Sequence, residues 1–413
     1  MKARLAVTLI TLLVVSACKQ QPEQLTVSHQ YIVEEMVSPT ADNASLARLF
    51  SHQGELWMSW VQQNDSMAFL YHASMASGQW SEPELVAQGD DWFNNWADFP
   101  VIAVNGDKRI GTYLQRSADG TYTYDVMLNH QGDQGWTKGI KVNRDTTKSE
   151  HGFVSVVPVD NDSFFLSWLD GRNTAGSHDH DHGGGGAMTL RGAIIGPDGE
   201  LLEDTELDGR VCDCCNTTTA MTSSGLIVAY RDRSLDEIRD IAVVRQIDGE
   251  WSDPKFVHAD NWEIAGCPVN GPALDAKGSD VVLAWFTAAD GEGEVRLSFS
   301  SDSGAQFAPF HRIDNGMATG RVDVVLLDPG TAAVIWMEPA GEQEVIQLKI
   351  IKDSGEILHQ QIITQTSPER ASGFPQLALY QDQLIFAWTE KGELVSAVNL
   401  ASMQLPPPEP KDE

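Results

Sequence analysis

The chain has 413 residues, of which 42% are hydrophobic and 21% charged, so it holds enough apolar material for a large folded body. Its formal net charge is −31 at pH 7, which makes nucleic acid and anionic lipid surfaces unfavourable partners and cations favourable ones. Beyond the N-terminal segment, no apolar run is long enough to cross a membrane as a helix. The composition therefore excludes a nucleic-acid-binding protein and a protein with several transmembrane helices.

The N-terminus predicts export and lipidation. Lys2 and Arg4 precede an apolar run over residues 5–15, which is too short for a stable membrane anchor and is typical of a signal peptide. The run ends in Val-Ser-Ala-Cys, and this segment resembles the lipobox of bacterial lipoproteins. The resemblance implies a signal peptide over residues 1–17 and a lipid on Cys18 that attaches the protein to a membrane. Lys19, in place of the aspartate that signals inner-membrane retention, predicts an envelope lipoprotein of the outer membrane.

A short β-branched run that ends in an aromatic residue recurs seven times, at intervals of 51 to 62 residues. The aromatic residues are Trp60, Tyr113, Trp168, Tyr230, Trp285, Trp336 and Trp388. Another alternating segment precedes each run, and one or two more follow it, as in a four-stranded blade. The sequence therefore predicts an all-β fold, a seven-bladed β-propeller over residues 44–403, with a six-bladed sialidase-like ring as the alternative.

The ends of the chain predict how the ring closes. The seventh unit stops near Leu400 without a fourth strand, while Leu25–Met36 is a strand-like segment that stands before the first unit. Pairing the two would remove the exposed strand edges of an open ring. We therefore expect residues 18–43 to form a lipidated tether and a closing strand, and residues 404–413 to form a proline-rich acidic tail.

One turn carries a family resemblance. Ser300, Asp302, Gly304 and Phe307 have the spacing of an Asp-box, and the segment resembles the repeated turn of sialidase-like (BNR-repeat) propellers. The resemblance implies a turn between the third and fourth strands of a blade, in which the aspartate accepts backbone N–H groups and the glycine supplies a positive φ. It also implies an exo-sialidase-like glycoside hydrolase, although the Arg-Ile-Pro motif of sialidases is absent.

Most of the unusual residues fall in loops that antiparallel topology places on one face of the disc. This face holds the loops between blades and the loops between second and third strands, and loops on a rigid scaffold often carry function. The expected catalytic acids or bases are Asp98, Glu150, Asp170, Glu237 and Asp323. The expected substrate ligands, chiefly arginines that bind an anion bidentately, are Arg172, Arg210, Arg231, Arg233, Arg321 and Asn270. Asp–Arg pairs can also tie neighbouring blades together.

Cysteines and histidines gather on the same face. Cys212, Cys214 and Cys215 share one inter-blade loop and Cys267 lies in the next, while His178, His180 and His182 alternate with aspartates in the blade before. Four cysteines in an oxidising envelope predict disulfides. The same residues are the ligands that Cu(I) or Zn(II) prefers, and a redox-active thiol pair is a third interpretation.

Three hypotheses about function follow. The first is an envelope-anchored sialidase-like propeller that binds or hydrolyses glycans, acidic ones in particular, on the inter-blade face. The alternative is a copper- or zinc-binding envelope protein that uses the cysteine and histidine loops. The third is a non-catalytic interaction scaffold, because a propeller alone does not define an activity.

Overall fold

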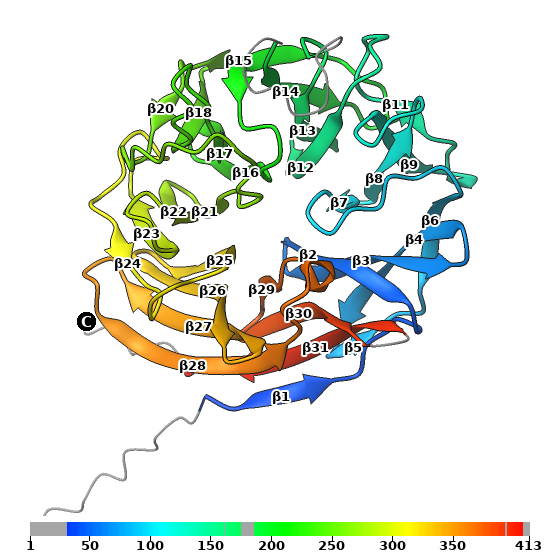
Figure 1. The fold of residues 1–413 in the computed structure, drawn as a ribbon. Helices are drawn as coiled ribbons and strands as arrows, with labels where there is room; N and C mark the ends of the chain where they lie inside the picture. The colour runs from blue at the N-terminus through cyan, green and yellow to red at the C-terminus, as the bar shows by residue number, and fades with distance from the viewer. Residues whose placement is uncertain (1–30, 161, 175–185, 393–394, 408–413) are drawn as a thin grey trace, which may run out of the picture.

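The computed structural model describes residues 31–160, 162–174, 186–392 and 395–407. These residues form seven antiparallel sheets, each with four strands in its main ladder, arranged around a common axis as the blades of a propeller (Figure 1). The seven-bladed prediction is confirmed, and the six-bladed alternative is wrong. Among the described residues, no helix is long and apolar enough to cross a membrane.

The first four blades follow one another along the chain, each beginning with its innermost strand. The first contains β2 (Ala44–His52), β3 (Glu55–Asn64), β4 (Met67–Ala76), β5 (Gln79–Trp80) and β6 (Glu84–Gly89). The second contains β7 (Val101–Asn105), β8 (Lys108–Arg116), β9 (Tyr124–Gly132), β10 (Gly135–Trp136) and β11 (Ile140–Lys141). The third contains β12 (His151–Val159), β13 (Ser163–Asp170), β14 (Met188–Ile195) and β15 (Thr205–Val211). The fourth contains β16 (Thr218–Thr222), β17 (Gly225–Arg231), β18 (Ile241–Ile247), β19 (Glu250–Trp251) and β20 (Lys255–Phe256).

The remaining blades complete the ring. The fifth contains β21 (Ala273–Lys277), β22 (Asp280–Thr287), β23 (Glu294–Ser300) and β24 (His311–Arg312). The sixth contains β25 (Gly320–Asp328), β26 (Thr331–Ala340), β27 (Gln343–Lys352) and β28 (Ile357–Thr366). A 3-10 turn, η1 (Arg370–Ser372), then leads to β29 (Gln376–Tyr380), β30 (Gln383–Lys391) and β31 (Ser396–Gln404) of the seventh.

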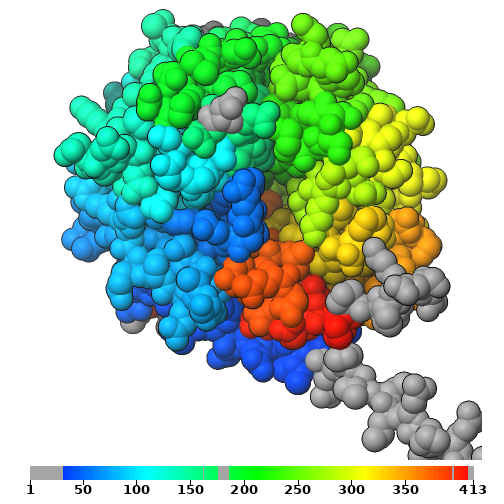
Figure 2. All heavy atoms as spheres, turned by 180° about the vertical axis from the view of Figure 1, so that it is seen from behind, coloured from blue at the N-terminus to red at the C-terminus, as the bar shows by residue number. Residues whose placement is uncertain are grey.

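The N-terminal strand completes the seventh blade. β1 (Val33–Met36) pairs antiparallel with β31, with Val33 opposite Met403 and Met36 opposite Leu400. The first and last blades adjoin in both views of the molecule, which differ by half a turn (Figure 2). The predicted closure is therefore confirmed for residues 33–36, while residues 25–30 of the expected segment lie outside the described part of the chain.

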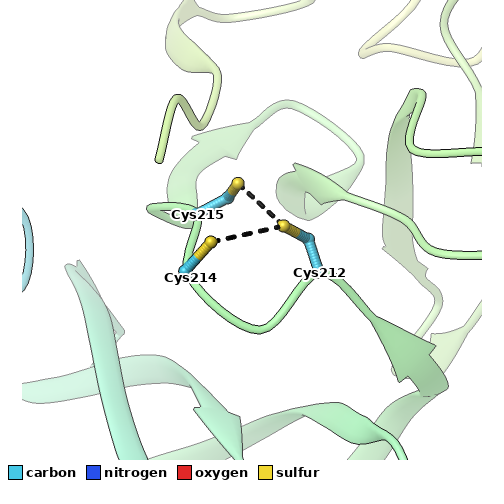
Figure 3. A group of neighbouring side chains, drawn as sticks. All are labelled: Cys212, Cys214 and Cys215. Atoms are coloured by element: carbon cyan, nitrogen blue, oxygen red, sulfur yellow. Dashed lines mark hydrogen bonds between the residues drawn. The ribbon is translucent and has the colours of Figure 1, made fainter. Parts of the chain in front are cut away.

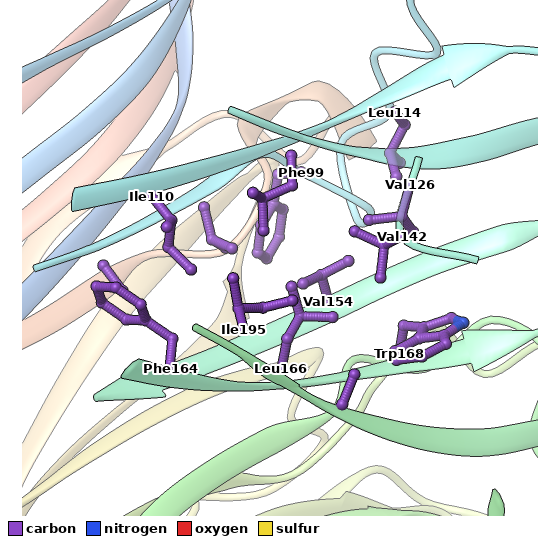
Figure 4. Close-up of a cluster of buried hydrophobic side chains, with 14 of the residues drawn as sticks. Phe99, Ile110, Leu114, Val126, Val142, Val154, Phe164, Leu166, Trp168 and Ile195 are labelled. Carbon is purple, nitrogen blue, oxygen red and sulfur yellow. The ribbon is translucent and has the colours of Figure 1, made fainter. Parts of the chain in front are cut away.

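The repeated aromatic residues are core residues of the second strands. Trp60, Trp168, Tyr230, Trp285 and Trp336 are at most 1% exposed. A buried indole keeps one N–H that needs an acceptor, and blade residues supply it: Trp168 donates to Asp170 at 2.9 Å and Trp336 to Glu338 at 2.7 Å. Apolar side chains of neighbouring blades pack between the sheets, as in the cluster around Phe164 and Val126 (Figure 4).

The Asp-box turn has the predicted role. It connects β23 to β24, and Oδ1 of Asp302 accepts the N–H of Gln306 at 2.9 Å, while Oγ of Ser300 accepts the N–H of Gly304 at 3.0 Å. Gly304 has φ +77°, which favours glycine. The turn is structural and lies on the face of the disc opposite the inter-blade loops.

Candidate functional site on the inter-blade loops

The loop between the first and second blades extends across the centre of the inter-blade face. Its Trp96 stacks on Phe374 of the sixth-to-seventh blade connection, with ring centroids 5.9 Å apart, and the guanidinium of Arg321 lies 4.7 Å from the Trp96 ring. On the other side, the amide of Asn216 donates to the carbonyl of Ala97 at 2.9 Å. Contacts with blades on opposite sides of the axis hold this loop, and with it Asp98, in place.

A tyrosine with two carboxylates forms the first chemical cluster of this face. The phenol oxygen of Tyr124 lies 3.0 Å from Oδ2 of Asp98 and 2.7 Å from Oε1 of Glu150. Oδ1 of Asp98 accepts the backbone N–H of Phe153 at 2.7 Å. Residue 152 must be glycine, because a Cβ there would lie 2.0 Å from Oδ2 of Asp98. Three separate segments therefore build the cluster.

The cluster holds more protons than three ordinary side chains would. Tyr124 has one hydroxyl proton and donates it to one carboxylate, so a second short contact needs a proton on the other acid. Burial raises the pKa of Asp98 to about 7, although hydrogen bonds from Phe153 and Tyr124 oppose the shift. Burial also raises the pKa of Glu150 well above its usual range, and the charges of Asp98, Asp213 and Cys267 add to this effect. Both shifts favour a proton shared within the cluster, and Glu150 is the more exposed of the two acids.

The other predicted catalytic carboxylates have partners within the fold. Asp170 is fully buried and accepts from the indole of Trp168 and from Arg172. Glu237 accepts from Arg233 and Arg239, each at 2.7 Å. Asp323 accepts the backbone N–H of Leu377 at 2.8 Å, and burial raises its pKa to about 6. These three residues lie apart from the Tyr124 cluster, and their catalytic roles stay predictions.

The predicted substrate ligands are largely engaged by the protein itself. Arg172 binds both oxygens of Asp170, and Arg233 binds Asp213 as well as Glu237. Arg231 is 1% exposed and donates to the carbonyls of Asn270, Arg239 and Phe286. Arg321 donates to Ser372 and Gly373. The side-chain oxygen of Asn270 accepts the N–H of Arg321, while Arg210 is half-buried in β15. The contacts of Arg231 and Arg321 link neighbouring blades, whereas Asp170 and Arg172 belong to one blade, and the substrate-binding roles of these residues stay predictions.

The cysteines converge without forming disulfides. The sulfur of Cys212 lies 2.8 Å from that of Cys215 and 4.0 Å from that of Cys214, and all three sulfurs lie within 4.8 Å of one another (Figure 3). A disulfide requires about 2.05 Å, and all four described cysteines are free. The predicted disulfides are therefore wrong. Cys267, from the next inter-blade loop, lies close enough to Cys214 that the neighbouring thiol lowers the pKa of Cys267.

A buried cation lies against the thiol cluster. Arg239 is 0% exposed, and its Nη1 donates to the sulfur of Cys212 at 3.4 Å. Burial alone would raise the pKa of Cys212, but hydrogen bonds from the thiols of Cys214 and Cys215 and the charge of Arg239 lower it well below its usual range. The remaining predicted ligands, His178, His180 and His182, lie outside the described residues.

A second group of side chains that could bind a metal ion already surrounds an arginine of the protein itself. Asp145, His151 and Asp170 offer atoms within 4.8 Å of one another. The guanidinium of Arg172 lies among them, 2.7 Å from Oδ2 of Asp170 and 3.9 Å from Oδ2 of Asp145. These groups form an internal ion network between the second and third blades.

A groove lies on the same face of the first blade. It has a volume of about 560 Å³ and is lined by Trp60, Phe69 and Tyr71 together with amides of Gln62, Gln63, Asn43 and Asn64. Phe69 and Tyr71 are only partly buried, and their rings stack with centroids 6.3 Å apart. Aromatic faces beside amide groups can contact both the apolar faces and the hydroxyls of a sugar.

Neither the Tyr124 cluster nor this groove was predicted from the sequence. Tyr124 begins an ordinary β-strand, and only Asp98 and Glu150 indicated chemistry near it. The residues that line the groove belong to strands and turns, and their sequence has no feature that marks a binding site. The chain has no motif at either place, so the signal arises only when the blades are assembled.

Comparisons with known proteins support the architecture. No family model matches the chain, and a search of curated proteins finds no match either. Among solved structures, a polysaccharide lyase of family PL25, an ulvan lyase, matches 88% of this chain and 94% of its own at 13% identity, with a TM-score of 0.54. The NanB sialidase from Streptococcus pneumoniae matches 85% of this chain and 83% of its own at 8% identity, with a TM-score of 0.46. Trypanosoma rangeli sialidase in complex with sialic acid matches 90% of this chain and 59% of its own at 13% identity, with a TM-score of 0.45. The class of protein is thus a seven-bladed β-propeller, and the likeness to the lyase is one of fold.

Proposed function

We propose that the protein is an envelope lipoprotein, anchored through Cys18, that binds a glycan on the inter-blade face and cleaves a glycosidic bond there with Glu150 as the general acid. The observation that carries the proposal is the phenol of Tyr124 in contact with two carboxylates. Cleavage of a glycosidic bond requires a protonated group beside the leaving oxygen, and a carboxyl group with a raised pKa is the usual donor. The Tyr124 cluster supplies such a group.

Each residue of the cluster has a distinct part. Glu150 is the most accessible of the three and gives its proton to the leaving oxygen. Tyr124 donates a hydrogen bond to Asp98, so its oxygen accepts a hydrogen bond from the carboxyl group of Glu150 and orients that group until the proton passes to the leaving oxygen. Asp98 is 1% exposed and acts by positioning Tyr124. Burial and the two neighbouring acids raise the pKa of Tyr124 well above its usual range, so the phenol keeps its proton and donates a hydrogen bond.

Two features support a glycan as the ligand. The groove on the first blade combines aromatic faces with amides, which is a surface that suits sugars. The Asp-box resembles that of sialidase-like propellers, and the ulvan lyase of similar fold holds a glucuronic acid–rhamnose sulfate segment. Because most predicted arginines are bound internally, the substrate panel has to include neutral as well as acidic glycans.

The experiment measures release of reducing ends from a panel of sialosides, uronate-containing polysaccharides and neutral polysaccharides. With an active substrate, Glu150→Gln should lower kcat by about 100-fold or more, since a positioned acid contributes roughly 10²–10⁴ in rate. The activity should fall as pH rises through the pKa of the acid. Glu342→Gln, which removes an exposed carboxylate from the β26–β27 loop of the same face, is the control and should keep full activity. Full activity of Glu150→Gln, or no substrate and no binding in the panel, would overturn the proposal.

A further inference from the structure

The thiol cluster is a built site that the proposed function leaves unused. It lies at the junction of two inter-blade loops, with Cys212, Cys214 and Cys215 from the loop between β15 and β16 and Cys267 from the loop between β20 and β21. The backbone fixes the first of these, because the N–H of Cys212 donates to the carbonyl of Arg231 at 3.0 Å. The sulfurs therefore meet because the strands before and after the loop are held in their blades.

The arrangement differs from that of a cysteine that only fills a core. Isolated buried thiols act as small apolar groups and pack against carbon. Here three sulfurs from four consecutive positions turn toward one another. A fourth thiol, that of Cys267, lies near Cys214 in the next loop. Cys212 and Cys215 are at most 1% exposed, whereas Cys267 is exposed. The site thus has a closed side and an open side, through which an ion can enter.

We propose that Cys212, Cys214 and Cys215 bind a single thiophilic d10 metal ion, Cu(I) or Zn(II), with Cys267 as the fourth ligand at the open side. Such ions bind thiolate sulfur at about 2.3 Å, which places two sulfurs of one tetrahedral site about 3.8 Å apart. The Cys212–Cys214 separation of 4.0 Å already fits this geometry. The Cys212–Cys215 separation of 2.8 Å has to open by about 1 Å, which a side-chain rotation provides.

The surroundings fit a site for thiolates. Several thiolates around one ion leave an excess of negative charge, and a buried cation offsets it. Arg239 fills this position, with Nη1 on the sulfur of Cys212 and Nη2 on Glu237. Hydrogen bonds from residues outside the ligand set also orient ligands and tune a metal site. The inference does not rest on glycan cleavage, because it uses none of the three residues of the Tyr124 cluster.

The test uses the full chain, purified without oxygen, in three measurements. Thiols are counted in denaturant without reductant, and Zn(II) and Cu(I) are titrated separately against chromogenic chelators. The sulfur–metal distance of the loaded protein is measured by X-ray absorption. We expect four reactive thiols in the metal-free protein, because the fifth cysteine, Cys18, carries the proposed lipid, together with one ion per chain and sulfur ligands at about 2.3 Å. The titration that shows the tighter stoichiometric binding identifies the ion.

Variants separate the two sides of the site. Cys212→Ser together with Cys215→Ser should abolish stoichiometric binding. Cys267→Ser should weaken it by at least the roughly 10–100-fold that loss of an outer-shell partner costs, because it removes one ligand while three remain in place. His258→Ala removes an exposed imidazole near the same loop and is the control, which should bind as the unchanged protein does. Cys267 is exposed, so its variant remains a test even if the buried double variant does not fold.

Three results would overturn the proposal. The first is a metal-free protein whose thiols react only after reduction, which would mean disulfides. The second is free thiols with no stoichiometric binding of either ion. The third is bound metal with nitrogen or oxygen ligands alone. Glu150→Gln distinguishes the two proposals, since this variant should lose glycan cleavage and still bind one metal ion per chain.

Discussion

Replacement of Asp98 by asparagine should change how the stability of the protein depends on pH. Asparagine keeps the shape of the side chain, and its carbonyl can still accept the N–H of Phe153, but it cannot ionise. In the folded protein the pKa of Asp98 is raised from 3.8 to about 7, because the side chain is buried. The folded state therefore holds a proton that the unfolded state releases between about pH 4 and pH 7.

The sign and size of the effect follow from this difference. Below about pH 4, Asp98 is protonated in both the folded and the unfolded state, and it does not change the free energy of unfolding. As pH rises from 4 to 7, Asp98 loses its proton in the unfolded state first, and the free energy of unfolding falls. A shift of about three units at 1.36 kcal/mol each gives on the order of 4 kcal/mol. Relative to the unchanged protein, Asp98→Asn should therefore gain up to about this much free energy of unfolding between pH 4 and pH 8.

Urea unfolding at several pH values measures the difference between the two proteins, so that groups common to both cancel. Asp302→Asn is the control of opposite sign. Burial slightly opposes ionisation of Asp302, but hydrogen bonds from Gln306 and Ser300 lower its pKa, so its variant should lose relative stability as pH rises. If the difference in free energy of unfolding between Asp98→Asn and the unchanged protein stayed constant from pH 4 to pH 8, the raised pKa of Asp98 would be refuted.

Three further changes test the anchor, the closure and the Asp-box. Cys18→Ser should release the protein from the membrane fraction, and a variant that still resists salt extraction would contradict lipid attachment. Deletion of Val33–Met36 should lower the free energy of unfolding by several kcal/mol, because it removes the hydrogen bonds between β1 and β31. Replacing the exposed Glu34 and Glu35 by alanine is the control and should have little effect. Equal melting temperatures for the unchanged protein and both variants would contradict the closure. Gly304→Ala should lower the free energy of unfolding by about 1–3 kcal/mol, because it combines a positive φ with a Cβ 2.3 Å from the side chain of Ile227. Gly291→Ala, at a positive φ with open space around the Cβ, is the control and should lower it less. Equal losses in the two variants would refute the clash with Ile227.

The blade architecture could be predicted because each blade repeats the same physical requirement. The second strand of each blade must bury a large side chain against the neighbouring blades. Aromatic residues such as Trp168 and Trp336 therefore recur once per blade. The closing strand could be predicted for a related reason, since the last blade lacked a strand and an unpaired strand stood at the start. Both predictions depend on patterns that persist along the chain.

The candidate sites could be predicted only in part. Topology alone placed the four cysteines on one face, but the state of their sulfurs depends on side-chain directions within a loop, and the predicted disulfides were wrong. The arginines looked like anion ligands because their partners, such as the carbonyl of Asn270 for Arg231, are backbone atoms that no side-chain pattern reveals. Tyr124 gave no signal because its role arises from loops of two other segments.

The two faces of the disc show why one residue type serves opposite purposes. Asp302 lies in an exposed turn, where nearby N–H groups stabilise its charge and fix the backbone. Asp98 is buried in the loop between the first and second blades, where burial disfavours its charge and the phenol of Tyr124 lies between it and Glu150. The loop that carries Asp98 is held in place by the stacking of Trp96 on Phe374, whose ring centroids lie 5.9 Å apart. The raised pKa of Asp98 depends on its burial, so a change that let water reach this side chain would return its pKa toward that of an ordinary carboxylate.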